Sequence, residues 1–290
     1  MTLASLLLQP FSEYGFMRRA LVATLALSLG SAPMGTLLVL RRMSLVGDAM
    51  GHALLPGAAL GFLIAGFSLP AMSLGGFFAA LAVALAAGFV TRTTSQREDA
   101  SFAAFYLIAL ALGVLMVSTH GSSVDLMHLL FGTILAVDDA ALLLIASVAS
   151  VTLAVLAVIY RPLVVECLDP GFLRNVGGRG TLVHAVFLVL TVANLVAGFQ
   201  ALGTLMAVGL MMLPATAARF WAAEVWSLAL VAAVIAALSG FIGLLLSYHA
   251  QWPSGPAIVL VAGIAYLLSV AAGPRDGLLW RHRRRPHRKA

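Results

Sequence analysis

Long apolar stretches separated by short polar breaks dominate the sequence, and they limit the folds open to it. The pattern predicts helices near 16–40, 44–68, 71–91, 100–118, 138–160, 181–199, 203–218, 225–247 and 253–272. A membrane-spanning helix needs roughly 20 predominantly apolar residues, which most of these stretches supply. Strands of an outer-membrane barrel would instead alternate apolar and polar residues. We therefore expect an all-α, polytopic membrane protein with about eight or nine transmembrane helices.

The composition excludes an ordinary soluble domain. Of the 290 residues, 62% are hydrophobic and 10% are charged, whereas soluble domains average about 45–50% and 25%. No linker separates the apolar stretches. We expect one transmembrane domain over residues 1–273 and a basic tail over 274–290.

The arginines predict the orientation of this domain. They gather in alternate breaks, at 41–42, 92–97, 161–179 and 219, and in the tail. Cytoplasmic loops carry the excess of basic residues in membrane proteins, so these breaks should be cytoplasmic and the N-terminus should lie outside. Arg18 and Arg19 then fall on the wrong side. An N-terminal helix lying in the membrane interface would remove that conflict.

Single residues exclude several kinds of site. The only lysine is Lys289, so the chain has no Walker A loop, which ends in Lys and Ser or Thr. ATP hydrolysis by this chain is therefore not expected. Cys167 is the only cysteine, which excludes an internal disulfide and a Cys-x-x-Cys metal site. The basic residues are scattered among loops, which favours contact with the lipid bilayer and not with nucleic acid.

Asp48 and His52 are polar residues inside an apolar span. A charged residue at the centre of the bilayer costs about 2.5–3.5 kcal/mol on insertion scales, so such residues usually face a cavity or a partner. Their spacing of four places both on one helix face. Pro56 has no N–H and therefore leaves the carbonyl of residue 52 without its helical hydrogen bond.

An imidazole and a carboxylate can both bind a divalent transition metal. Two ligands are too few for a tetrahedral site, but a two-fold homodimer would bring two Asp48 and two His52 together. Small residues four apart, Gly47 with Gly51 and Gly57 with Gly61, allow close helix packing. The alternative is that the pair only holds helices together, through each other or through Arg41 or Arg42.

The stretch from Arg41 to Gly57, RRMSLVGDAMGHALLPG, resembles the signature of the metal-importing ABC permeases, the ABC-3 type that takes up zinc, manganese or iron. Further similar segments follow in order, at 125–137, 168–178, 201–219 and 253–260. Gly51 departs from the family, which often has Ser before the motif His.

The resemblance implies a homodimeric permease in the bacterial cytoplasmic membrane. Its partners would be two ATP-binding cassette subunits on the cytoplasmic side and an extracytoplasmic metal-binding protein. Asp48 and His52 of both protomers would contact the metal in the translocation pathway. No permanently bound cofactor is implied.

The break at 161–180 is the longest cytoplasmic one, and within it an Asp-Pro pair marks a helix start. The resemblance makes this segment the coupling helix that contacts the ATPase, through Asp169, Pro170, Phe172 and Arg174. Gly171 stands where the family usually has an acidic residue. At 125–132 a short amphipathic helix carries Asp125 and His128, which could guide metal inward or be solvated.

These observations predict the permease subunit of an ATP-driven metal importer. Zn²⁺ exceeds Mn²⁺ in intrinsic affinity for such ligands, so zinc is the first expectation. Manganese or iron import by the same mechanism is the alternative. A secondary transporter driven by protons or Na⁺ is a further alternative, but it would need several intramembrane carboxylates.

Overall fold

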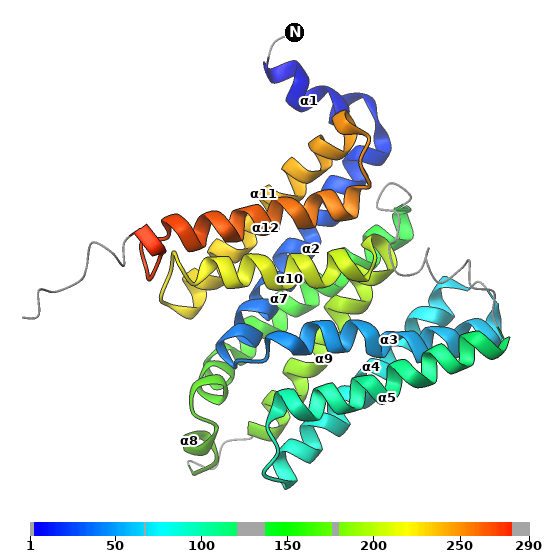
Figure 1. The fold of residues 1–290 in the computed structure, drawn as a ribbon, viewed down its shortest axis with the longest axis vertical. Coiled ribbons are helices and arrows are strands. Elements are labelled where there is room, and N and C mark those ends of the chain that lie inside the picture. The colour runs from blue at the N-terminus through cyan, green and yellow to red at the C-terminus, as the bar shows by residue number, and fades with distance from the viewer. Residues whose placement is uncertain (1–2, 67, 121–136, 176–179, 280–290) are drawn as a thin grey trace, which may run out of the picture.

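A computed structural model describes residues 3–66, 68–120, 137–175 and 180–279. Within these ranges the chain is helical and contains no strand. Figure 1 shows the helices as one bundle in which α3, α4 and α5 lie together at one edge. The helices are α1 (Leu3–Glu13), α2 (Gly15–Leu40), α3 (Ser44–Ala65), α4 (Leu69–Thr93), α5 (Glu98–His120), α7 (Asp139–Leu168), α8 (Pro170–Asn175), α9 (Gly180–Leu202), α10 (Thr204–Ala218), α11 (Val225–Ala250) and α12 (Ser254–Ala272).

Eight of these helices are long and apolar enough to cross a membrane, and α10 is a shorter apolar helix of 15 residues. The predicted all-α polytopic architecture is confirmed. One difference concerns α7, which runs past the predicted end at residue 160 to Leu168. Pro162 lies inside it, and the last turns are held by the buried side chains of Leu163 and Glu166.

Side-chain and backbone contacts join the arginine-bearing helix ends on one side of the bundle. Arg41, after α2, lies 2.6 Å from His184 near the start of α9. Arg92, at the end of α4, bonds Glu166 near the end of α7. The backbone N–H of Arg275, after α12, donates to the carbonyl of Phe220, after α10. This clustering agrees with the cytoplasmic side predicted from the arginines.

Arg18 and Arg19, which the predicted orientation places on the wrong side, lie at the opposite ends of the helices. A separate helix, α1, precedes α2, and both arginines lie in the first turns of α2. Arg19 lies 3.5 Å from Asp139 at the start of α7. This carboxylate offsets the positive charge of Arg19, and α2 is long and apolar enough to span the membrane. The outward position of this end stays a prediction.

Glycines set how closely the neighbours of α3 approach it. A Cβ on Gly57 would overlap the carbonyl of Gly75 in α4, and one on Gly61 would meet the backbone of Ala71. Gly113 of α5 lies directly against the ring of Pro56.

The other small pair of α3 faces a different helix. A Cβ on Gly47 would lie 3.0 Å from Met211 and Met212, and one on Gly51 would lie 3.2 Å from Val208, all in α10. Both small-residue pairs of α3 therefore pack within one chain, against α4 and α10. The close approach predicted from their spacing is used inside the bundle.

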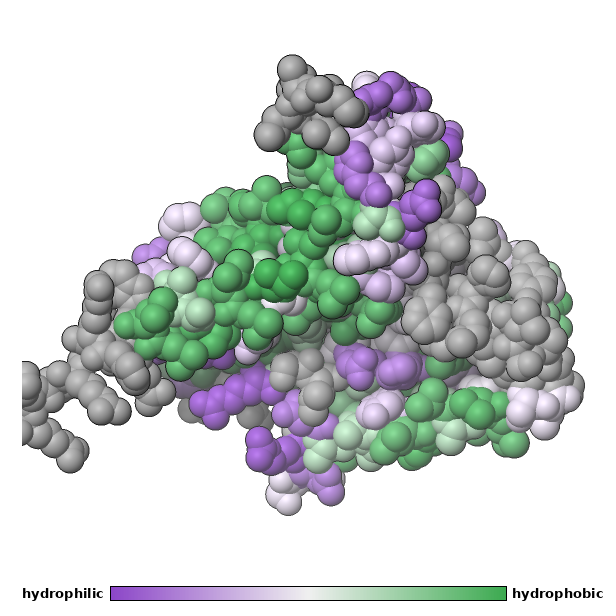
Figure 2. Space-filling view, turned by 45° about the horizontal axis from the view of Figure 1, so that its top comes forward, coloured by the Kyte–Doolittle hydropathy of each residue, from purple (hydrophilic) through white to green (hydrophobic). Residues whose placement is uncertain are grey.

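Large apolar side chains cover the outer faces of the bundle. Figure 2 shows two hydrophobic areas separated by a strip of hydrophilic residues. Exposed examples are Phe78 and Phe89 of α4, Val158 of α7, and Leu267 and Leu268 of α12. Because an apolar surface of this extent is stable only in contact with lipid or another protein, it fits the membrane environment. The predicted helix at 125–132, with Asp125 and His128, and the tail from residue 280 lie outside the described residues.

Candidate metal site in the membrane

The Asp48 and His52 side chains lie side by side on α3, as their spacing predicts. Oδ1 of Asp48 is 3.7 Å from Nε2 of His52. At 1.5 Å per residue, the two Cα atoms lie roughly 6 and 12 Å along α3 from its start. The pair therefore lies in the half of α3 that follows Arg41 and Arg42, which the predicted orientation makes the cytoplasmic half.

The pair opens into a groove of about 320 Å³. Its walls come from α3, α10 and α12, and are formed by Asp48, Gly51, His52, Thr204, Leu205, Val208, Gly209 and Val259. Apart from the Asp48–His52 pair and Thr204, the wall is apolar. A cation that entered this groove would find its charged ligands on α3.

The carboxylate is not covered by its own chain. The side chain of Asp48 is 63% exposed and that of His52 is 37% exposed. Among the described residues, the ion contact found for Asp48 is the one with His52. Arg41, an alternative partner at the sequence level, is directed instead at His184. Because a charge facing acyl chains is costly, this face of α3 must meet water or protein.

The donor set of one chain is small. Across the described residues, no group of three or more His, Cys, Asp or Glu side chains is close enough to hold a metal ion. Nδ1 of His52 is buried and has no hydrogen-bond partner in this part of the chain. The ring of Tyr106, on α5, stacks near the imidazole with 6.1 Å between ring centres. One chain thus supplies two ligands and a buried nitrogen that still needs a partner.

The segment predicted to contact an ATPase begins at Asp169. Oδ1 of Asp169 accepts the backbone N–H of Phe172 at 2.9 Å, which caps the short helix α8. Pro170 is the first residue of that helix, and Arg174 lies in it. The Phe172 side chain is 56% exposed. An exposed aromatic ring outside the predicted membrane core is suited to a protein contact.

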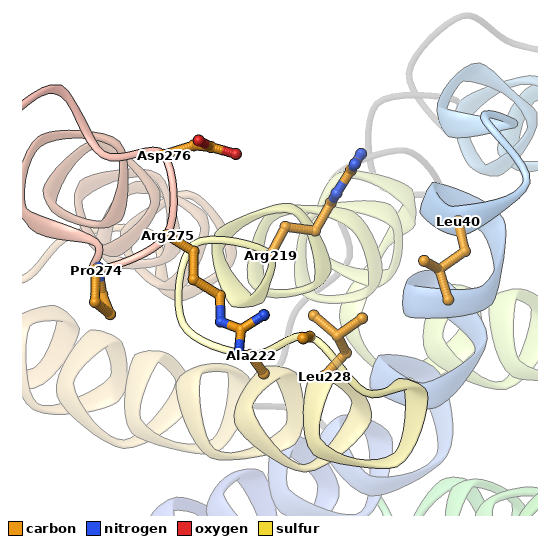
Figure 3. A pocket seen from close by; sticks show the side chains of 8 residues that line it. Leu40, Arg219, Ala222, Leu228, Pro274, Arg275 and Asp276 are labelled. Atoms are coloured by element: carbon orange, nitrogen blue, oxygen red, sulfur yellow. The ribbon is translucent and has the colours of Figure 1, made fainter. Parts of the chain in front are cut away.

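A second hollow, of about 490 Å³, lies among the cytoplasmic ends of the helices. Figure 3 shows Arg275 extending toward Ala222 and Leu228, whereas Asp276 points away from them. Arg219, at the end of α10, lines the same hollow. Two arginines against one carboxylate repel a divalent cation, so this hollow is not a second metal site.

Sequence reasoning missed a buried carboxylate in the last turn of α7. Glu166 is 1% exposed, and its carboxylate accepts a hydrogen bond from Arg92 at 2.8 Å. A lone carboxylate in the apolar run of α7 was the available signal. Its partner, however, lies 74 residues away and could not be assigned by helical spacing.

The comparison that decides the family covers most of the chain. Residues 13–273 match the model of the ABC 3 transport family. The chain belongs to this family. Together with its eight apolar spans, membership makes the chain a multi-pass protein of the bacterial cytoplasmic membrane.

Two relatives in this family differ in the metal of their names. "Manganese import system permease protein ScaB" of Streptococcus parasanguinis is 31% identical over 265 residues, which is 91% of this chain and 93% of the relative. "Probable iron transport system membrane protein" of Haemophilus influenzae is 28% identical over 279 residues, covering 96% and 97% of the two chains. Zinc appears in neither name, so the first expectation of zinc gains no support.

The fold is also that of a solved protein. The structure of PsaBC from Streptococcus pneumoniae in complex with a Fab superposes with a TM-score of 0.83 and 26% sequence identity. The similarity covers 97% of this chain and all of the other. The arrangement of helices around the groove therefore belongs to a known transporter fold.

Proposed function

We propose that this chain is the permease subunit of an ATP-driven importer of Mn²⁺, with iron as the alternative cargo. The observation that carries this proposal is the Asp48–His52 pair, which lies within a span and opens into a groove. Family membership supports transport powered by ATP. The chain has no Walker A loop of its own, so a separate subunit would bind the ATP.

Two copies of the chain would complete the site. A homodimer that buries the open face of α3 would place two carboxylates and two imidazoles around one axis. That arrangement would remove Asp48 from contact with lipid. The exposed pair and its incomplete donor set both support this arrangement.

The ligand set suits manganese. Carboxylate, carbonyl and water oxygens are ligands typical of Mn²⁺, and imidazole is tolerated. Asp48 supplies such an oxygen, and Pro56 leaves the carbonyl of His52 without a helical donor. The name of the relative ScaB also favours manganese over zinc. The absence of thiolates from the groove suits a site that must release its ion, because thiolates hold soft metals tightly.

Partners would drive the movement of the ion. An extracytoplasmic binding protein would deliver Mn²⁺ to the outer face. Two ATP-binding subunits would contact α8, where Phe172 is exposed, and switch the groove from outward-facing to inward-facing. The membership of the ABC family weighs against the ion-coupled alternative.

Uptake of radioactive manganese tests the site. We expect Asp48→Ala and His52→Ala each to lower uptake by more than about 100-fold, beyond the roughly 10–100-fold loss seen when outer-shell groups of metal sites are removed. Asp139→Asn and His249→Ala are matched controls, since both residues lie at helix ends away from the groove. They should transport like the wild type.

Competition measures the choice of metal in the same assay. Excess unlabelled Mn²⁺ should suppress uptake more strongly than equal Zn²⁺. Normal accumulation by both Asp48→Ala and His52→Ala, with the protein present in the membrane, would show that the site lies elsewhere. Stronger suppression by Zn²⁺ or Fe²⁺ would reject manganese as the cargo.

A further inference from the structure

A buried ion pair joins three helices directly before the segment that leads into α8. Oε1 of Glu166, in the last turn of α7, accepts a hydrogen bond from Nη2 of Arg92 at 2.8 Å. Arg92 belongs to the last turn of α4. Its other terminal nitrogen, Nη1, donates to Oγ1 of Thr181 in α9 at 3.2 Å. One guanidinium therefore ties the cytoplasmic ends of α4, α7 and α9 together.

The surrounding residues leave room for this pair. A Cβ on Gly180, the first residue of α9, would overlap Oε2 of Glu166. Gly88 lies one turn before Arg92 on α4, and a Cβ there would lie 3.4 Å from Nε2 of His184. The glycines at these two positions let α4 and the end of α7 pack directly onto the first turns of α9.

A second contact links α9 to the segment just before α3, the helix that carries Asp48 and His52. Nη1 of Arg41 lies 2.6 Å from Nδ1 of His184. The same guanidinium lies over the ring of Phe187, 5.6 Å from its centre. Thr181, His184 and Phe187 follow one another at intervals of three and therefore share a face of α9. Arg41 precedes α3, which carries Asp48 in its second turn.

These contacts form a continuous route between the two functional ends of the chain. It runs from α8 through Glu166 to Arg92, along one face of α9 to Arg41, and into α3. A buried carboxylate that loses its counter-charge is strongly destabilised. The end of α7 therefore cannot move away from Arg92 without cost, and a displacement of α8 that pulls on the end of α7 would strain its contacts with α4 and α9.

We propose that Glu166 and Arg92 are positioning residues that transmit the movement of α8 to the metal-binding helix α3. This inference rests on the proposed function, because it requires α8 to receive the movement of the ATPase and α3 to hold the ion. The pair differs from a static clamp in one measurable respect. Its loss separates ATP hydrolysis from metal movement, whereas loss of a clamp lowers both in proportion.

The test measures Mn²⁺ transported per ATP hydrolysed, in proteoliposomes that contain the permease, its co-purified ATP-binding subunit and its binding protein. We expect Glu166→Gln and Arg92→Gln to lower this ratio by at least about fivefold, the lower end of typical coupling between sites. ATP hydrolysis should stay within about twofold of the wild type, because the subunits still assemble. Arg19→Gln removes an exposed pair at the outer surface and should leave the ratio unchanged.

If Glu166→Gln and Arg92→Gln do not assemble with the ATP-binding subunit, Arg92→Lys tests the proposal in their place. Lys keeps a positive charge beside Glu166. Its compact ammonium, however, cannot bond Glu166 and Thr181 together as the planar guanidinium of Arg92 does. We expect an assembled transporter with an intermediate ratio. The double variant Glu166→Gln/Arg92→Gln should be no worse than either single variant, because both remove the same pair.

Two results would overturn this inference: an unchanged Mn²⁺-to-ATP ratio in an assembled variant, or transport and hydrolysis falling together. Failure of the proposed function is detected separately. If Asp48→Ala transports Mn²⁺ as fast as the wild type in the same vesicles, the metal site is wrong, whatever Glu166 and Arg92 do. Mn²⁺ binding to the variants in detergent should match the wild type, since the pair lies outside the groove.

Discussion

At the scale of single residues, the glycines of α3 decide how closely the helix that carries Asp48 and His52 packs against its neighbours. Gly57 lies against the backbone of Gly75, so a side chain there would push α3 and α4 apart. This contact fixes one side of α3, and Gly47 and Gly51 fix the side that faces α10. The direction of Asp48 and His52 follows from these contacts.

Replacing Gly57 therefore has a predictable cost. We expect Gly57→Ala to destabilise the protein by about 1–3 kcal/mol, the usual cost of overpacking a close contact. Gly263→Ala in α12 is the matched control, because a Cβ there would find no atom within 4 Å. Thermal unfolding of both variants in detergent checks this. A loss of stability as large for Gly263→Ala as for Gly57→Ala would contradict the packing account.

Individual residue pairs also show which contacts can be predicted from the sequence and which cannot. The proximity of Asp48 and His52 was predictable, because the helical period fixes neighbours four residues apart. The pairing of Glu166 with Arg92 was not, because tertiary packing brings together residues of different helices. For the same reason His184, near a helix end, showed no sign in the sequence that it would meet Arg41.

At the scale of helices, the predicted spans agree with the observed ones because long apolar runs specify helices in a membrane whatever their neighbours. The end of α7 is the exception. The sequence predicts that this helix ends near residue 160, yet it continues to Leu168. Burial of Leu163 and Glu166 against the neighbouring helices outweighs the cost of the proline, and sequence patterns do not report such packing.

The short helix α8 gives a prediction at this scale. Truncating the exposed ring of Phe172 to Ala should weaken association with the ATP-binding subunit by about 1–3 kcal/mol, roughly a 5- to 150-fold loss, as for a buried aromatic anchor of an interface. Asp169→Ala should act in the same direction through loss of the helix cap, worth about 1 kcal/mol. Quantitative co-purification measures both effects.

Asp169→Asn provides the control for the cap. Its side-chain oxygen can still accept the N–H of Phe172, so association should remain near that of the wild type. Retention of the ATP-binding subunit at wild-type strength by Phe172→Ala would mean that α8 is not the contact.

At the scale of the whole molecule, large apolar side chains cover much of the outer surface of the described residues and suit lipid. The face with Asp48 differs, because it carries a charge at membrane depth. Periodicity predicted that face, but the residues that line its groove from α10 and α12 became apparent only from packing. Under the proposed function, a second copy of the chain would complete the donor set without adding another kind of subunit.

The stoichiometry of manganese binding tests this account most directly. Equilibrium dialysis of the purified permease at saturating Mn²⁺ should find one ion for every two chains, and binding should disappear in Asp48→Ala. Binding of one ion per chain would contradict the shared site. Binding that survives in Asp48→Ala at the wild-type ratio would contradict the assignment of Asp48 itself.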